Sequence, residues 1–426
     1  MIQSSETSVR PRCGPGALGR RPAGAAEQRT QESCRLRRRR GVKRWLAALV
    51  AMAAASAGCS AGATPSTTSS PRSTITASST AASTSTTVPP CVHYGAGLSF
   101  VNELDGFAMF SDCSGAAGRR YRLYASTDGG ASWRPVARLS FAARAASVPA
   151  PGGFGFNHLS FVSRSFGVAY LGDEILVTTD AGLRWHSEAV SGVVAKIFTS
   201  DGAAWAVVLR PCGSGECDTS VVPVLLSRLG APRPLPAHYV TDVVAFGRTW
   251  YAGPANKALW VSHDLGKTWQ PHAFPIRRNL VGAEQIAAAR AGVVWVACEL
   301  AISAGAEAKS IFLSLNGGLT WKETAQAAAF NITRSIGQLS ATGYVAGMAA
   351  VSARRAVLRI GSPVGRIEVS RDGGVVWAVL GIPSDGGSPT FGVECVGNSC
   401  WTSGPNAVYR STDGGAHWSR SAIWTE

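Results

Sequence analysis

Ser411-Thr412-Asp413-Gly414-Gly415-Ala416-His417-Trp418 is the last of six copies of one eight-residue pattern. The pattern reads Ser or Thr, any residue, Asp, any residue, Gly, two further residues and Trp. Asn316 is the one departure, at the acid position. The fixed positions of the six copies are Ser126, Asp128, Gly130 and Trp133; Thr178, Asp180, Gly182 and Trp185; Ser262, Asp264, Gly266 and Trp269; Ser314, Asn316, Gly318 and Trp321; Ser370, Asp372, Gly374 and Trp377; and Ser411, Asp413, Gly415 and Trp418.

The residue types of this motif predict a tight hairpin. Asp or Asn accepts hydrogen bonds from main-chain N–H groups one to three residues on, and a Ser or Thr hydroxyl bonds locally. Gly supplies the positive φ of a tight turn. Trp then starts the return strand and fills a large apolar slot. The six acid positions are therefore assigned to turn architecture, and none of them is a catalytic candidate.

The motif resembles the Asp-box, or BNR, repeat of sialidases, sortilin-type receptors and photosystem II assembly-factor-like propellers. In those families the repeat joins the third and fourth strands of a blade. The copies begin at residues 126, 178, 262, 314, 370 and 411, so the second interval is long enough for two blades. Within it, Val224–Gly230 is a strand and turn without the Asp and the Trp, which indicates a degenerate blade.

Residues 91–426 divided among seven blades give about 48 residues each, a length typical of propeller repeats. The predicted fold is therefore all-β, a seven-bladed β-propeller of four-stranded antiparallel blades. Six blades, or two separate small sheets, are the alternatives that the spacing leaves open.

The first 90 residues have the features of an export signal and a tether. A basic run (Arg37–Arg44) precedes the apolar segment Trp45–Ala57 and then Gly58-Cys59, as in a signal peptide. Ser56–Cys59 resembles a bacterial lipobox, which implies lipidation of Cys59; the alternative is an ordinary secretory signal cut near Ala57. We therefore expect a leader and signal at 1–58, a Ser/Thr-rich disordered tether at 59–90 and the propeller at 91–426.

The net charge of +15 is concentrated outside the expected propeller. Residues 1–44 hold twelve of the 41 Lys and Arg residues and three acids. A nucleic-acid-binding protein normally carries such charge on its folded domain. The charge distribution therefore argues against a nucleic-acid partner.

The cysteine spacing predicts disulfides. Cys212 and Cys217, and likewise Cys395 and Cys400, bracket four residues of a predicted hairpin turn, which favours two local bridges in an oxidising compartment. A third bridge, Cys91–Cys113, is expected between the remaining early cysteines. Cys298 is then left as a buried structural thiol. No His lies near either close pair, so no metal site is predicted.

The sequence offers no catalytic set. The resemblance to sialidases is confined to the motif, because no Arg-Ile-Pro segment follows residue 91 and no Tyr–Glu pair has a defensible spacing. A xyloglucanase-type glycosidase needs two carboxylates facing one cleft. Acids outside the motif, some of which could face a central channel, include Asp105, Asp173, Glu174, Asp201, Asp242, Glu284, Glu299 and Glu394, but their spacing shows no converging pair.

The favoured interpretation is a non-catalytic binding or assembly scaffold without a cofactor. It is extracytoplasmic and lipid-anchored to the cell membrane, with a secreted form as the alternative. Three predicted inserts break the repeat rhythm and are expected to bind a protein or glycan at the rim: Pro211–Asp218, Ala301–Lys309 and Ala350–Gly365. The competing interpretation is an exported glycoside hydrolase, xyloglucanase-like or sialidase-like.

Overall fold

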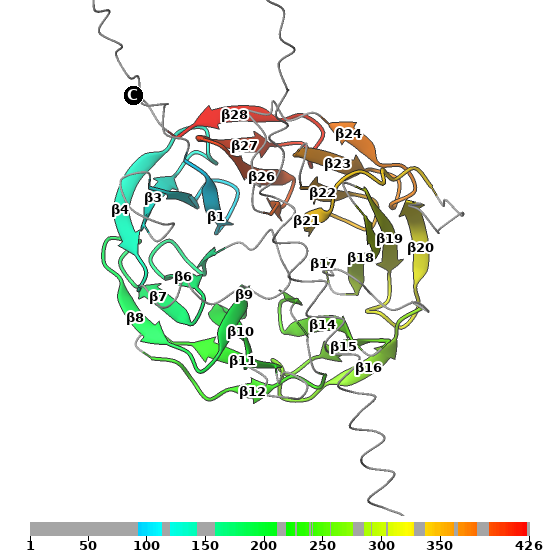
Figure 1. Ribbon diagram of the computed structural model, residues 1–426, viewed down its shortest axis with the longest axis horizontal. Helices are drawn as coiled ribbons and strands as arrows, with labels where there is room; N and C mark the ends of the chain where they lie inside the picture. The colour runs from blue at the N-terminus through cyan, green and yellow to red at the C-terminus, as the bar shows by residue number, and fades with distance from the viewer. Residues whose placement is uncertain are drawn as a thin grey trace, which may run out of the picture. The chain divides into compact units, whose positions relative to one another are not determined.

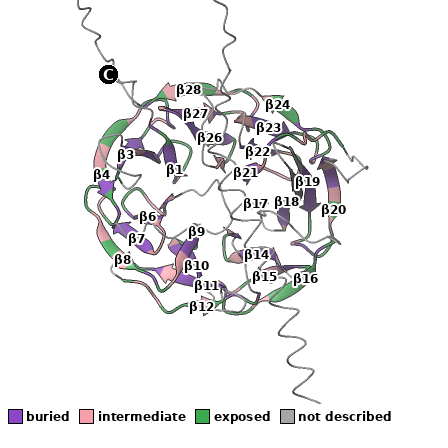
Figure 2. Ribbon diagram, in the orientation of Figure 1, coloured by how far each residue is buried: buried purple, intermediate pink, exposed green. Residues whose placement is uncertain are grey.

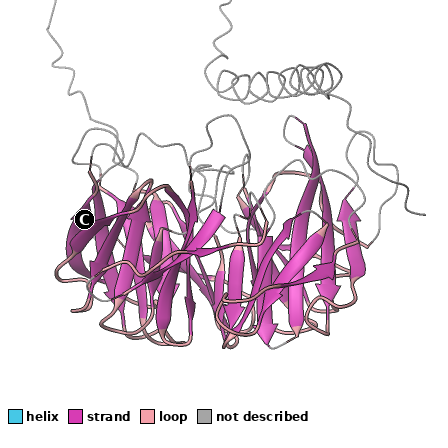
Figure 3. Ribbon diagram, turned by 90° about the horizontal axis from the view of Figure 1, so that it is seen from below, coloured by secondary structure: helices cyan, strands magenta, loops and turns pink. Residues whose placement is uncertain are grey.

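The computed structural model describes residues 93–112, 120–142, 158–210, 219–225, 228–237, 240, 242–255, 257–275, 285–290, 292–303, 306–327, 337–361, 365–380 and 392–423. The chain divides into two compact units, Met1–Thr86 and Thr87–Glu426, and every described residue lies in the second. In this part of the chain all regular structure is β-strand (Figure 3).

The 28 strands form seven four-stranded antiparallel sheets, each built from consecutive strands. Blade 1 contains β1 (Gly95–Phe100), β2 (Gly106–Ser111), β3 (Arg120–Ser126) and β4 (Arg134–Ser140). Blade 2 contains β5 (Leu159–Phe161), β6 (Gly167–Leu171), β7 (Glu174–Thr178) and β8 (His186–Ala189). Blade 3 contains β9 (Val193–Ser200), β10 (Ala203–Leu209), β11 (Thr219–Val224) and β12 (Arg233–Pro234). Blade 4 contains β13 (Val243–Phe246), β14 (Thr249–Ala255), β15 (Ala258–Ser262) and β16 (Gln270–Ala273).

The remaining three sheets repeat this order. Blade 5 contains β17 (Gln285–Arg290), β18 (Val293–Ser303), β19 (Ala306–Ser314) and β20 (Lys322–Ala327). Blade 6 contains β21 (Val345–Ala350), β22 (Ala356–Ile360), β23 (Arg366–Ser370) and β24 (Ala378–Leu380). Blade 7 contains β25 (Glu394–Val396), β26 (Ser399–Gly404), β27 (Ala407–Ser411) and β28 (Ser419–Ala422). The seven-bladed propeller predicted from the sequence is confirmed, and the six-bladed alternative is wrong.

The blades close into a ring, with the first strand of each blade nearest the centre (Figure 1). First strands of neighbouring blades contact one another, and β25 of the last blade contacts β1 of the first. Because the strands alternate in direction, two kinds of turn lie on the same side of the ring. These are the turns between first and second strands and those between third and fourth strands. The six motifs all lie on this side of the ring.

The hydrophobic core is divided among the seven joints between blades. Each middle strand serves two joints, because successive side chains point to opposite faces of a strand. In β10, Ala204 and Ala206 pack with blade 2, whereas Trp205 and Val207 pack with blade 4. The middle strands are consequently buried on both faces, and exposed residues gather on the outermost strands (Figure 2).

The joint between blades 7 and 1 closes the ring, and each blade there is complete without exchanging a strand. Phe100 stacks on Trp401 with ring centroids 3.7 Å apart. The indole Nε1 of Trp401 donates to the Gly129 carbonyl at 2.7 Å. The His93 backbone N–H donates to the Asn406 side chain at 2.8 Å, and the Asn406 N–H donates to the His93 carbonyl at 2.9 Å. Side-chain packing and hydrogen bonds therefore hold this joint.

Candidate functional site

All six motifs form the same turn. The Ser or Thr hydroxyl donates to the Asp or Asn side chain at 2.7–3.0 Å. The same oxygen accepts from the backbone N–H of the motif Gly at 2.7–3.0 Å. The acid position accepts from the N–H of the residue just before the Trp at 2.9–3.1 Å. The turn is thus built almost entirely from contacts within eight residues.

Two details differ from the sequence-based expectation. The Asp reaches the N–H groups three and four residues on, as Asp264 does with Lys267 and Thr268, because the hydroxyl already takes the Gly N–H. The Trp precedes the fourth strand instead of starting it, so β4 begins at Arg134, directly after Trp133. In four motifs its indole Nε1 donates to the motif Gly carbonyl, which folds the ring back over the turn.

The turn hydrogen bonds keep the motif carboxylates ionised. Partial burial acts to raise the pKa of Asp128, but hydrogen bonds from Ser132 and Ser126 outweigh it and lower that pKa to about 2. The N–H and hydroxyl of Thr268 hold the pKa of Asp264 well below its usual value. A carboxylate that already accepts three or four hydrogen bonds is a poor general acid or base at neutral pH.

Five of the six motif Gly residues lie where a side chain does not fit, because a Cβ on each would come within 2.3–2.8 Å of another atom. A Cβ on Gly374 would lie 2.4 Å from Thr324 Oγ1 and 2.7 Å from the Trp295 ring, both in the preceding blade. Its φ of +90° is also unfavourable for an L side chain. The motif turn therefore closes its own hairpin and packs directly against the blade before it.

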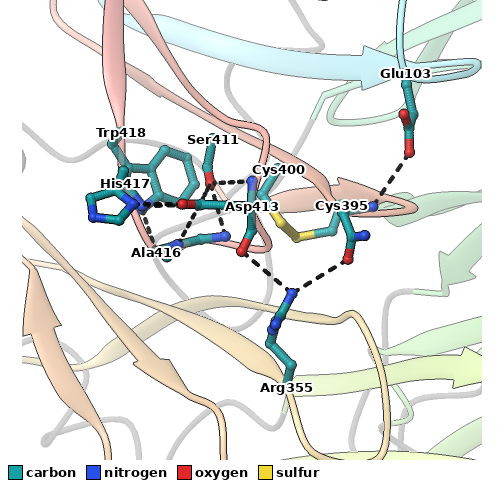
Figure 4. Close-up of a disulfide and its surroundings, with 11 residues drawn as sticks. Glu103, Arg355, Cys395, Cys400, Ser411, Asp413, Ala416, His417 and Trp418 are labelled. Atoms are coloured by element: carbon teal, nitrogen blue, oxygen red, sulfur yellow. Dashed lines mark hydrogen bonds and ion pairs between the residues drawn. A yellow bond between two sulfur atoms is a disulfide. The ribbon is translucent and has the colours of Figure 1, made fainter.

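A disulfide lies beside the last motif (Figure 4). Cys395 and Cys400 are joined by a disulfide that links β25 to β26. In the turn between them, the Asn398 carbonyl accepts from the Gly414 N–H at 2.7 Å, and its side chain accepts from Arg355 of blade 6 at 3.4 Å. The same Arg355 donates to the Asp413 carbonyl at 3.3 Å. The disulfide thus secures a turn that connects blades 6 and 7.

The acids singled out outside the motif lie on several blades, and most of those described connect one element to another. Glu394 of β25 accepts from the Phe100 N–H of blade 1 at 3.2 Å, and Glu299 of β18 accepts from Val345 of blade 6 at 2.9 Å. Asp242 accepts from Ile286 of blade 5 at 2.7 Å and from Lys196 of blade 3.

Three of the remaining acids also join neighbouring blades. Glu174 accepts from the Ala142 N–H of blade 1 at 2.6 Å. Asp105 and Asp201 form ion pairs with Arg164 at 2.6 Å and Arg248 at 3.1 Å, each on the next blade. Asp173 lies in the turn between β6 and β7, and Glu284 lies outside the described residues. Six of the seven described acids in this set therefore join one blade to another.

Burial has marked consequences at Glu394 and at a lysine, Lys309. Enclosure of Glu394 raises its pKa to about 8, although the hydrogen bond from Phe100 acts to lower it. Lys309 is fully buried, and its ammonium donates to the carbonyls of Ser340, Ala341, Thr342 and Gly343. Sequence reasoning missed this lysine, because the segment that holds it is more than 30 residues away and carries no charged residue.

Two of the three predicted inserts are corrected by the structure. Most of Ala301–Lys309 continues β18 and begins β19, so this hairpin is an extension of blade 5. Ala350–Gly365 contains the turn after β21 and all of β22, an ordinary part of blade 6. Small and apolar residues prolong strands as readily as loops, and the repeat spacing could not distinguish the two. Pro211–Asp218 lies outside the described residues.

Several other predicted residues lie outside the described part: Cys59, Cys91, Cys113, Cys212 and Cys217. Cys298 is fully buried between blades 4 and 5. Among the described residues, no cluster of three or more His, Cys, Asp or Glu side chains could hold a metal ion. Nor does this part of the chain contain a helix with the length and hydropathy needed to cross a membrane.

Blade 3, which lacks the motif, has a cavity of about 370 Å³ at its outer edge. Residues from the end of β10, from β11 and from the segment around β12 line it: Arg210, Thr219, Ser220, Pro234, Leu235 and Pro236. The alternation Pro232-Arg233-Pro234-Leu235-Pro236 is the sequence signal that could have marked this edge, since Pro is tolerated there.

Solved structures of other propellers are similar to this chain. The GH74 enzyme of Niastella koreensis is 14% identical, with a TM-score of 0.42 over 76% of this chain and 65% of that one. YCF48 bound to D1 peptide is 16% identical, with a TM-score of 0.42 over 64% and 83% of the two chains. The WD40 beta propeller domain of Doa1 is 12% identical, with a TM-score of 0.46 over 75% and 92%.

These likenesses concern the fold alone. This chain matches less than two thirds of the length of the Niastella koreensis enzyme. At these identities and TM-scores, the likenesses carry no conclusion about the function of this chain. No family model and no curated protein sequence matches the chain. The assignment to the β-propellers therefore rests on the seven four-stranded sheets of the structure itself.

Proposed function

We propose that this chain is an exported, membrane-anchored propeller that acts as a binding or assembly scaffold without catalysing a reaction. The observation that carries the proposal is the use made of its carboxylates. Asp242, Glu299 and Glu394 each accept a backbone N–H from the next blade, and the motif acids are held within their turns. Acids committed to joints are poorly placed to serve as the acid and base of a glycosidase.

The six motifs are, in this proposal, Asp-boxes of the BNR type. Their shared turn, their position between third and fourth strands and their contact with the preceding blade support that assignment. A rigid ring of this kind presents its turns and connecting loops as a recognition surface. The partner is a protein or a glycan bound at the rim.

Export and anchoring form the second part of the proposal. The Cys395–Cys400 disulfide supports an oxidising compartment, since such bonds persist outside the cytosol. Lipidated Cys59 would anchor the chain, and residues 60–90 would act as the tether. Cys59→Ala is expected to release the protein into the medium, with Cys298→Ala as the matched cysteine control. Retention of the Cys59→Ala variant on the membrane contradicts this anchor.

The scaffold role is tested with the full chain isolated from native membranes. We expect a reproducible set of co-purifying proteins or glycans and no turnover of aryl-glycosides above the blank. Turnover that disappears when one carboxylate, such as Asp242, is changed to Asn while the protein stays folded would overturn the proposal in favour of a glycoside hydrolase. Unfolding curves of the same variants separate loss of activity from loss of structure.

A further inference from the structure

Blade 3 differs from the other six at its outer edge. In place of a motif, Val224 bridges to Leu229 and the Gly230 N–H donates to the Pro223 carbonyl at 2.7 Å. Its fourth strand, β12, has two residues, where the fourth strands of the other blades have three to seven. The cavity described above therefore lies where a full outer strand covers the third strand in other blades.

The short strand leaves Thr219 buried with an unused hydroxyl. The Leu235 N–H donates to the Thr219 carbonyl at 2.9 Å, which brings Pro234 directly opposite Ser220. Thr219 is 4% exposed and lines the cavity, and its Oγ1 has no hydrogen-bond partner among the described residues. A buried hydroxyl without a partner costs free energy that a ligand atom can recover.

The described lining of the cavity carries one positive charge. Arg210 is exposed at its wall, and none of the described lining residues is acidic. The nearby Arg233 is already engaged, because its guanidinium lies 4.7 Å from the Trp205 ring centroid and donates to the Leu265 carbonyl of blade 4. Arg210 is thus the only cation among the described lining residues.

The other walls are mainly apolar. Pro234 and Pro236 are exposed on one side of the segment, and Leu235 between them is buried. Such walls favour a carbon-rich group over a fully hydrated ion, and the described lining residues include no aromatic face on which a sugar ring could stack. The volume falls within the range of small-molecule sites.

We propose that this cavity binds a monovalent organic carboxylate that carries a short apolar group. The Arg210 guanidinium pairs with the carboxylate, the Thr219 hydroxyl donates to one of its oxygens, and the prolines contact the apolar part. Two sources share this chemistry, a free short-chain acid and the C-terminus of an extended peptide. The site goes beyond the proposed scaffold role, and it depends on neither export nor anchoring.

The test measures ligand binding to the full chain in detergent by calorimetry and by saturation-transfer NMR. The probes are butanoate, N-acetyl-alanyl-alanine, the C-terminal amide of that dipeptide and inorganic phosphate. The variants are Arg210→Gln and the nearly isosteric Thr219→Val. Arg184→Gln, an exposed arginine in the motif of blade 2, is the matched control. Thermal unfolding of each variant shows whether it is folded.

We expect both carboxylates to bind and the amide to bind at least about tenfold more weakly. Arg210→Gln should weaken binding by about tenfold or more, and Thr219→Val by roughly three- to tenfold. Tighter binding of the dipeptide than of butanoate assigns the peptide source, and the reverse order assigns the free acid.

Four results would overturn the proposal. They are no binding of either carboxylate up to the solubility limit, equal binding of the amide, phosphate binding as tight as that of the carboxylates, and an Arg210→Gln effect no larger than that of Arg184→Gln. None of them bears on whether the propeller is a scaffold, so failure here is distinct from failure of the proposed function.

Discussion

The carboxylate of Glu394 makes the joint between blades 7 and 1 sensitive to pH. Its two oxygens lie 3.2 and 3.3 Å from the Phe100 backbone nitrogen, and its enclosure raises the pKa from 4.5 to about 8. Replacing Glu394 with Gln keeps an oxygen that accepts the N–H and removes the ionisable proton. The substitution therefore isolates the cost of the charge.

The sign of the effect follows from proton binding. Between about pH 4.5 and pH 8 the folded protein keeps a proton on Glu394 that the unfolded chain has lost, so stability falls as pH rises through this interval. At 1.36 kcal/mol per pKa unit the upper bound is about 5 kcal/mol. Glu394 is only partly buried, and relaxation around the charge reduces this, so we expect about 2 kcal/mol.

The assay is urea unfolding followed by tryptophan fluorescence, at about pH 4, 6.5 and 9. Glu394→Gln should match the wild type at the lowest pH and exceed its free energy of unfolding by about 2 kcal/mol at the highest. Glu188→Gln, on the outermost strand β8, serves as the control and should leave the pH profile unchanged. Parallel profiles for Glu394→Gln and the wild type, or a less stable variant at high pH, would refute the reasoning.

Three further substitutions test the turns and the buried lysine. Ser411→Ala removes the acceptor of the buried Gly415 N–H and should lower the free energy of unfolding, measured by urea titration, by about 1–3 kcal/mol. The exposed Ser132→Ala is the control, and an equally small loss in both variants contradicts the proposed role of the hydroxyl in the turn. Gly374→Ala should destabilise more than Gly202→Ala, since both have positive φ but only Gly374 meets neighbouring atoms, and equal losses would show that packing there is irrelevant. Lys309→Met leaves four backbone carbonyls without the ammonium that they accept from, and should lower the free energy of unfolding by about 3–5 kcal/mol, seen as a lower melting temperature. An unchanged melting temperature would mean that water replaces the ammonium without loss of stability.

The fold could be predicted because its signal is local. Ser411, Asp413, Gly415 and Trp418 act on one another within one turn, and the turn recurs at blade-length intervals. The degenerate blade 3 could be placed because a double interval needs two blades. A turn whose hydrogen-bonding residues are close in sequence can therefore be recognised from the sequence alone.

The joints between blades could not be predicted in the same way. Glu394 meets Phe100 across 294 residues, and Lys309 meets carbonyls that belong to no recognisable pattern. Nothing in the local sequence distinguishes such an acid or lysine from a solvated one. The cavity of blade 3 was missed for a related reason. Its polar residues Arg210 and Thr219 are brought together by the pairing of β10 with β11, and Pro234 joins them through the pairing of β11 with β12.

The joint between blades 7 and 1 also has a consequence for synthesis on the ribosome. Six of the seven joints unite blades that are adjacent in the chain, so each can form as soon as the second blade of its pair has emerged. The seventh core, in which Leu98 and Phe100 of blade 1 meet Trp401 and Ile423 of blade 7, has to wait until blade 7 has emerged. Throughout that time blade 1 keeps an apolar face uncovered. Blade 1, which is synthesised first, is therefore the part of the growing chain most prone to aggregation and to chaperone binding. Any substitution that slows the folding of blade 7 prolongs this exposure.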